Sequence, residues 1–120
     1  NLRINTSIML MLMRQPLHNR STEYADNRIS LYSAQWGKCA ITGHEFRSVA
    51  EIHCHHATPR SKGGTDKYEN LVLILESVHR LIHATRPETI NHYKEICSLN
   101  VSQMKKLNEF RQKAGLESIA

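Results

Sequence analysis

The stretch that decides the fold is EIHCHHATPRSKGGTDKYENLVLILESVHRLIHA, residues 51–84. Two adjacent histidines, His55 and His56, stand near its start. Neighbouring side chains of an extended segment point to opposite faces, so one imidazole can hold a metal ion while the other handles a proton. Near the end of the stretch, His79 and His83 are four residues apart. On a helix this spacing places both on one face, where they can bind the same cation.

An isolated HxxxH pair is a weak indication of a metal site, because two histidines on a helix more often form a solvated or half-buried face. In this chain the pair follows HHxxP, the Gly63-Gly64 turn and Asn70, in that order and within one short segment. The ordered set favours a metal site over a solvated face.

The pattern of apolar residues predicts a strand, a polar loop, a second strand and a helix in succession. Their expected ranges are residues 49–55, 59–69, 71–75 and 76–84. A further strand and turn is expected over residues 38–46, ahead of this unit. Within the loop, the two glycines allow a tight turn and a close backbone approach.

Helices are expected on both sides of this unit, over residues 27–36, 87–97 and 101–114. The fold class is therefore α+β: a short antiparallel hairpin and a metal-bearing helix, flanked by N- and C-terminal helices. We expect one domain over residues 21–120. Residues 1–20 would be an N-terminal appendage or the remnant of an upstream domain, since the chain begins at Asn1 rather than Met. Its Met- and Leu-rich patch could contact such a domain or pack on this domain's own core.

The quoted stretch resembles the ββα-metal, or HNH, endonuclease motif, in the double-histidine form shared with colicin-type DNases. The resemblance implies that His55, His79 and His83 ligate one divalent cation. It also implies that His56 is the general base and that Asn70 holds the ring of His56 in its working orientation. The reaction implied is hydrolysis of a DNA phosphodiester bond to a 3′-hydroxyl and a 5′-phosphate.

The flanking stretches RISLYSAQWGKCAITG and HATRPETINHYK extend this resemblance over residues 27–94. They are similar to the C-terminal endonuclease region of group II intron-encoded reverse transcriptase/maturases. That context implies nicking of the second DNA strand, with intron RNA bound through the rest of a parent protein. Two alternatives are a stand-alone HNH restriction or homing nuclease, and a non-catalytic DNA-binding module stabilised by zinc.

Many HNH domains carry a structural zinc held by two CxxC pairs, and this chain departs from that pattern. Cys39 is followed by Thr42 at the first pair, and Leu75 and Val78 stand where the second pair would fall. A tetrahedral zinc site needs four good donors, so we predict no structural zinc and expect apolar packing in its place. For the catalytic cation, Mg²⁺ or Mn²⁺ is expected to support activity, and Zn²⁺ or Ni²⁺ can occupy imidazole ligands.

A formal charge of +5 and an isoelectric point near 9.3 favour a polyanionic partner such as DNA. In the polar loop, Arg60, Lys62 and Lys67 can meet phosphates or simply solubilise the loop. The basic residues of the last helix are expected to face water more than DNA; they are Lys105, Lys106, Arg111 and Lys113.

Two residues of the first strand are candidates for a supporting role. His53 lies two residues before His55 and would share its face, where it could touch a phosphate or assist a metal ligand. Glu51 would continue that face and orient a ligand imidazole, or else remain a solvated carboxylate.

Cysteine usage and hydropathy bear on the compartment. Cys39, Cys54 and Cys97 are odd in number and unpatterned, which argues against a secreted disulfide framework and favours reduced thiols in the cytoplasm. The longest apolar run, residues 8–13, is far shorter than the roughly 18 residues that a membrane helix needs.

Overall fold

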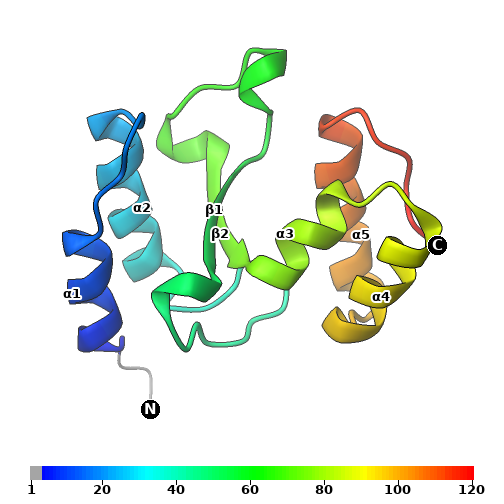
Figure 1. The fold of residues 1–120 in the computed structure, drawn as a ribbon, viewed down its shortest axis with the longest axis horizontal. Helices are drawn as coiled ribbons and strands as arrows, with labels where there is room; N and C mark the ends of the chain where they lie inside the picture. Colours follow the sequence, from blue (N-terminus) through cyan, green and yellow to red (C-terminus); the bar gives the residue numbers. More distant parts are fainter. Residues whose placement is uncertain (1–3) are drawn as a thin grey trace.

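The fold is organised around a two-stranded antiparallel sheet whose second strand leads directly into a helix (Figure 1). Strand β1 spans Ile52–His56, strand β2 spans Leu71–Leu75, and helix α3 spans Glu76–His83. The computed structural model describes residues 4–120, so residues 1–3 of the expected appendage lie outside the described residues. The α+β class and the ββα-metal arrangement predicted from the sequence are confirmed.

Helices cover this core from two sides (Figure 1). Helix α2 packs against β2 and α1 packs against α2, while α4 and α5 contact α3 on the other side. Their bounds are Thr6–Arg14 for α1, Thr22–Ala34 for α2, Pro87–Cys97 for α4 and Val101–Lys113 for α5. The expected helices over residues 87–97 and 101–114 are confirmed. Within residues 4–120, none of the helices has the length and hydropathy needed to cross a bilayer.

The strand register sets which side chains face the helices. His55 pairs with Val72 and His56 with Leu71, so the two histidines point to opposite faces of the hairpin. Strand β2 is apolar at every position, and both Leu73 and Ile74 are fully buried. An uninterrupted apolar strand is what a sheet covered on both faces requires.

Two of the predicted strands differ from the structure. Strand β1 begins at Ile52, because residues Val49–Glu51 form a 3₁₀ turn, which removes Glu51 from the strand. Residues 38–46 form only an isolated bridge between Lys38 and Glu45. Part of its backbone bonds within the turn, where the Cys39 amide donates to the His44 carbonyl, and part bonds to β2, where the Ala40 amide donates to the Leu73 carbonyl.

Helix α2 begins earlier than the predicted residue 27. The Ser21 side chain accepts a hydrogen bond from the Tyr24 amide and so caps the helix. The first turns of α2 are mostly polar, which is why apolar periodicity missed them. The helix ends at Ala34, and Trp36 and Gly37 follow with positive φ angles of 56° and 67°.

Two buried arginines tie helix ends to the core. Arg111 of α5 donates from Nη1 to the carbonyl oxygens of Leu81, Ile82 and Ala84 at distances of 2.8–3.0 Å. Arg28 of α2 donates from Nη2 to the carbonyl of Leu12 at 3.0 Å. In both cases a cation satisfies carbonyl groups at the C-terminal end of a helix, where the helix dipole is negative. Arg111 is therefore not part of a solvated basic face, contrary to expectation.

The N-terminal helix packs on the domain's own core, which was one of the two alternatives for the Met- and Leu-rich patch. Ile8 and Leu12 join the same hydrophobic cluster as β2 and α3, while Met11 and Met13 face solvent. The domain boundary after residue 20 stays a prediction.

Apolar packing occupies the place where two further cysteines would hold a structural zinc. Val78 has no exposed surface, and the buried Cys39 sulfur accepts a hydrogen bond from the Leu75 amide at 3.4 Å. A donor set of one thiol does not fit tetrahedral zinc. The absence of a structural zinc stays a prediction that metal analysis can test.

We expect Leu12→Ala to lower the free energy of unfolding by about 2–5 kcal/mol, because it opens a cavity beneath α1. The side chain of Leu12 is 1% exposed, and that of Met11 next to it is 57% exposed. Met11→Ala is the matched control and should change stability by less than about 0.5 kcal/mol. Urea denaturation measures both; equal midpoints for the two variants would show that α1 does not stabilise the core.

Candidate metal centre

Three histidines converge where β1 meets α3. His55 comes from β1, and His79 and His83 come from successive turns of α3. Their ligand nitrogens all lie within 4.8 Å of one another. The sequence predicted this set, because the alternation of the strand and the four-residue spacing on the helix each place a histidine on a defined face.

Burial keeps these imidazoles neutral. Desolvation, followed by the neighbouring His79 and His83, lowers the pKa of His55 to about 3. Burial is also the largest cause that lowers the pKa of His79 to about 4, and it lowers the pKa of His83. A neutral imidazole carries the nitrogen lone pair that a metal ion needs, so all three side chains are in their ligand form near neutral pH.

One nitrogen atom of the cluster lacks a hydrogen-bond partner within residues 4–120, which indicates that a ligand can bind there. The Nε2 atom of His55 is buried and has no hydrogen-bond partner among the described residues. Buried polar atoms are rarely left without a partner, because losing contact with water costs free energy. A cation bound by the three histidines would satisfy this nitrogen, so the donor set fits a divalent metal.

The cluster brings together three protein donors. Within residues 4–120, no further His, Cys, Asp or Glu joins the set. His53 instead stacks on His79 with ring centroids 4.9 Å apart, and its Nε2 lies 3.6 Å from Oε2 of Glu76. Three protein ligands and an open position are typical of catalytic metal sites, whereas structural sites are usually closed by four.

His56 lies on the other face of β1, beside the cluster. Its Nε2 atom is hydrogen-bonded to Oδ1 of Asp66 at 2.8 Å, and its ring stacks on Tyr24 with centroids 5.7 Å apart. The side chain is 13% exposed. A nearly buried imidazole with a carboxylate partner is held in one orientation and can exchange a proton with a group in the adjoining cleft.

Asp66 is a partner of His56 that the sequence did not reveal. Hydrogen bonds from His56 and then from Ser21 are the main causes that lower the pKa of its carboxyl below the ordinary value. Ser21 Oγ donates to Oδ2 at 2.6 Å. The periodicity of apolar residues predicts neither contact, because Asp66 lies in a polar loop and Ser21 is 45 residues away along the chain.

Asn70 contacts the loop rather than the His56 ring. Its side-chain amide bonds to the amide and the carbonyl of Thr58 and to the carbonyl of Thr65, at 2.8–3.1 Å. The ring-orienting contact expected of Asn70 is therefore made by Asp66. The reason is the position of each residue in the loop. Asn70 lies at the end of the loop and bonds to Thr58 at its start, while Asp66 lies within the loop and bonds to the His56 ring.

The loop also depends on one close backbone approach. A Cβ atom on Gly64 would lie 1.7 Å from the carbonyl oxygen of Thr58, so only glycine fits there. Gly64 therefore lets the loop backbone lie against Thr58, the residue to which the Asn70 side chain is hydrogen-bonded. This is the tight turn that the Gly63-Gly64 pair predicted.

Glu51 does not orient a ligand imidazole. It lies in the 3₁₀ turn before β1, where its Oε2 accepts a hydrogen bond from the Arg47 amide at 2.9 Å. The turn ends the alternation of the strand, so the expected shared face with His53 and His55 does not extend to residue 51.

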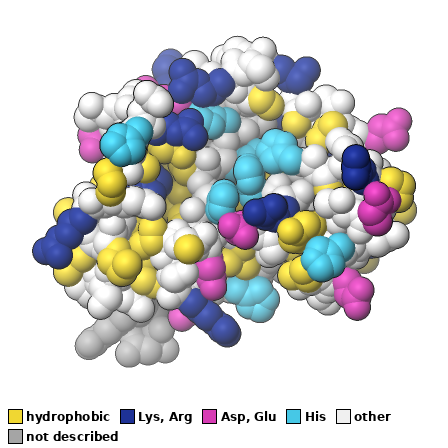
Figure 2. Space-filling model, in the orientation of Figure 1, with side chains coloured by type: hydrophobic (Ala, Val, Ile, Leu, Met, Phe, Trp, Pro, Cys, Tyr) yellow, Lys and Arg dark blue, Asp and Glu magenta, His cyan; other side chains and the backbone are white. Residues whose placement is uncertain are grey.

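A cleft of about 440 Å³ contains His55, His56, His79 and His83. Figure 2 shows histidine side chains gathered in a hollow at the centre of one face, with Lys and Arg side chains along its upper edge. Arg60 lines the cleft, as expected of a residue that meets phosphates. Two arginines that the sequence did not indicate also line it, Arg20 and Arg28. Lys62 and Lys67 do not line it; the Lys62 ammonium approaches Gly115 after α5.

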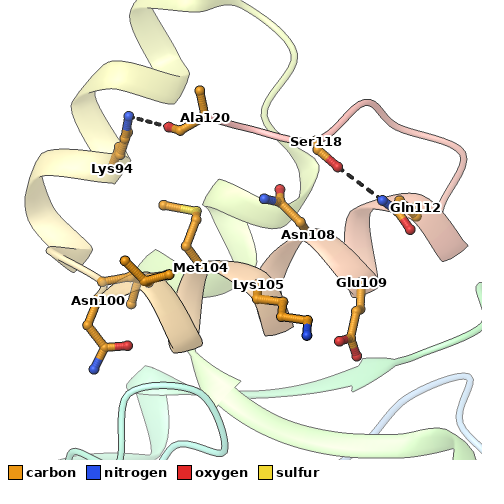
Figure 3. Close-up of a pocket in the computed structure, with 11 residues that line it drawn as sticks. Lys94, Asn100, Met104, Lys105, Asn108, Glu109, Gln112, Ser118 and Ala120 are labelled. Atoms are coloured by element: carbon orange, nitrogen blue, oxygen red, sulfur yellow. Dashed lines mark hydrogen bonds between the residues drawn. The ribbon is translucent and has the colours of Figure 1, made fainter.

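A larger cavity, of about 720 Å³, lies between α4, α5 and the C-terminal residues (Figure 3). Its lining includes Met104, Asn108 and Glu109, and no histidine or cysteine. The clustered histidines therefore line the smaller cleft and not this cavity.

A hairpin that leads into a helix, with two histidines on the helix and one on the hairpin, defines the ββα-metal class. Residues 37–85 match the family model HNH, described as HNH endonuclease. The match supports an HNH domain over this segment, which indicates a nuclease that acts on nucleic acid. The cluster of His55, His79 and His83 could hold a divalent metal. No curated protein and no solved structure matches the chain significantly.

The match does not reach the outer parts of the sequence similarity to group II intron proteins, residues 27–36 and 86–94. That narrower resemblance has no support from the comparisons and stays a prediction. The matched segment includes every histidine of the cleft, but not Ser21 or Tyr24, which contact Asp66 and His56.

We expect His79→Ala to weaken zinc binding by more than about 100-fold, the upper end of what loss of a mere supporting partner costs. Isothermal titration calorimetry on the metal-free protein measures the affinity and the stoichiometry. His92→Ala removes an exposed histidine outside the cluster and should bind one zinc ion as the wild type does. Equal affinities for the two variants would contradict the proposed ligand set.

Proposed function

We propose that this protein is a metal-dependent DNA endonuclease that hydrolyses phosphodiester bonds to leave a 3′-hydroxyl and a 5′-phosphate. The observation that carries the proposal is the cluster of three imidazoles whose lowered pKa values keep them neutral, beside a histidine that is hydrogen-bonded to a carboxylate. The family match over residues 37–85 supports the same class of chemistry.

His56 is the general base in this proposal. As a neutral imidazole it takes a proton from a water molecule, and the water oxygen forms a bond to phosphorus in line with the leaving group. The bond from phosphorus to the 3′ oxygen breaks, and that oxygen leaves with the electron pair and takes a proton from solvent. The Tyr24 ring and Asp66 restrict the motion of His56 during this transfer.

His55, His79 and His83 would hold the divalent cation. A cation there would act as a Lewis acid that stabilises negative charge on the phosphate and the leaving oxygen. Mg²⁺ or Mn²⁺ is the proposed ion for turnover, because hard cations bind phosphate oxygens; Zn²⁺ or Ni²⁺ can occupy the same imidazoles.

Basic side chains would hold the DNA backbone across the cleft. Arg60 is more than half exposed at the cleft, and Arg20 lines it from the segment before α2. Lys62 and Lys67 extend the positive charge along the exposed loop. Contacts of this kind bind phosphates without reading the base sequence, and they weaken as salt concentration rises.

The kind of protein to which this domain belongs is a narrower part of the proposal. Second-strand nicking for a group II intron protein rests on the flanking similarity over residues 27–94, and a stand-alone restriction or homing nuclease would use the same site. A reverse-transcriptase reading frame joined upstream of residue 1 would decide for the intron setting.

We expect His56→Ala to reduce plasmid nicking by about 10²- to 10⁴-fold, because a positioned general base contributes rate enhancement of that size. Supercoiled plasmid is incubated with the purified chain and Mg²⁺, Mn²⁺, Zn²⁺ or EDTA, and nicked product is quantified on gels. Zinc affinity should be unchanged, since His56 lies outside the cluster.

His92→Ala is the control for loss of a histidine and should nick at the wild-type rate. Absence of nicking by the wild type with every metal, together with tight binding of one zinc, would favour the non-catalytic DNA-binding module instead.

A further inference from the structure

The first turns of helix α2 are hydrogen-bonded to the loop that carries Asp66, the partner of His56. Ser21 both caps this helix and reaches across the chain: its Oγ accepts from the Tyr24 amide at 3.0 Å and donates to Asp66 Oδ2 at 2.6 Å. A serine hydroxyl has one proton to donate and lone pairs that accept, so the two contacts are compatible. The helix cap and the carboxylate are therefore coupled through one oxygen atom.

Two further residues of α2 contact the same place. Asn27 donates from Nδ2 to the backbone carbonyl of Asp66 at 2.9 Å, and the Tyr24 ring stacks on His56 at an interplanar angle of 17°. Ser21, Tyr24 and Asn27 are spaced three residues apart, which puts them along one side of the helix. All three lie outside the segment that matches the HNH family model.

The contacts of Asp66 determine which nitrogen of His56 carries the proton. Hydrogen bonds from His56 and Ser21 lower the pKa of the Asp66 carboxyl, so the group is ionised near neutral pH. An ionised carboxylate only accepts hydrogen bonds, so the His56 Nε2 atom, 2.8 Å away, must be the donor. Neutral His56 then has its lone pair on Nδ1.

We propose that Asp66, held by Ser21 and Asn27, is a positioning residue that fixes the ring orientation and the tautomer of His56. The first turns of α2 are thereby part of the catalytic apparatus, although they lie outside the family match. The expected effect on turnover rests on the proposed nuclease function. The tautomer of His56 can be measured without turnover.

Holding the loop does not require the carboxylate. The Asn27 contact uses the backbone carbonyl of residue 66, and Asn70 closes the loop through Thr58 and Thr65. These bonds persist when the Asp66 side chain is replaced. Removal of the carboxylate therefore leaves the loop anchored and releases the His56 ring.

The test compares Asp66→Ala with Asp26→Ala, which removes an exposed carboxylate from α2 and is the matched control. Two-bond ¹H–¹⁵N NMR spectra of the zinc-loaded protein report the tautomer of His56, with His56→Ala used for assignment. Steady-state nicking gives kcat and KM separately. Calorimetry gives zinc affinity, and thermal melting follows the fold.

In wild type and Asp26→Ala we expect His56 to be protonated at Nε2. In Asp66→Ala we expect a mixture of tautomers and a kcat lower by about 10- to 100-fold, the usual cost of losing a partner that orients a functional imidazole. The KM for DNA and the zinc affinity should change less than about twofold, because neither the phosphate contacts nor the three ligands are touched.

An Asp66→Ala variant with the wild-type tautomer and kcat would overturn the proposal, as would a loss of kcat that merely parallels lost zinc affinity and a lower melting temperature. If that variant does not fold, Asp66→Leu replaces it, because a leucine side chain of similar size can neither accept nor donate a hydrogen bond. Full kcat together with the wild-type tautomer in Asp66→Leu would overturn the proposal. If the wild type nicks no DNA, the nuclease function fails, and the NMR comparison alone decides whether Asp66 sets the tautomer.

Discussion

The pairing of β1 with β2, and the direct passage from β2 into α3, is the constraint on which the rest of the structure depends. Because Leu75 ends the strand and Glu76 begins the helix, the axis of α3 is fixed relative to the hairpin. That geometry brings His55 against His79 and His83. A hairpin of two short strands is marginal alone, so it relies on the apolar face of β2 and on the helices that cover it.

Burial serves both the core and the chemistry. The packing that buries Leu73, Val78 and Leu81 also buries His55 and half-buries His79, whereas His83 stays exposed. Desolvation then lowers the pKa values of His55 and His79 and keeps them neutral, as metal ligands must be. Arg111 supports the same arrangement from α5, because it satisfies the carbonyl groups that α3 leaves at its end.

The two histidines of β1 are treated differently by their surroundings, although they are neighbours in sequence. His55 faces apolar and imidazole groups, and its buried Nε2 atom has no hydrogen-bond partner within residues 4–120; His56 faces a carboxylate and an aromatic ring. The alternation of side chains along the strand is enough to place the two histidines in different environments. One segment therefore places one imidazole in the cluster of histidines and the next imidazole against a carboxylate.

The sequence by itself determined the parts that depend on local periodicity: strand β2, the helices from α3 to α5, and the spacing of the three clustered histidines. Only the tertiary structure decided the partner of His56, the place of Glu51 outside the strand and the burial of Arg111. Asp66 meets Ser21 across 45 residues and Arg111 meets Leu81 across 30. Hydrogen bonds that polar side chains make with groups so far away along the chain have no periodic signature in the sequence, because they depend on how the elements pack.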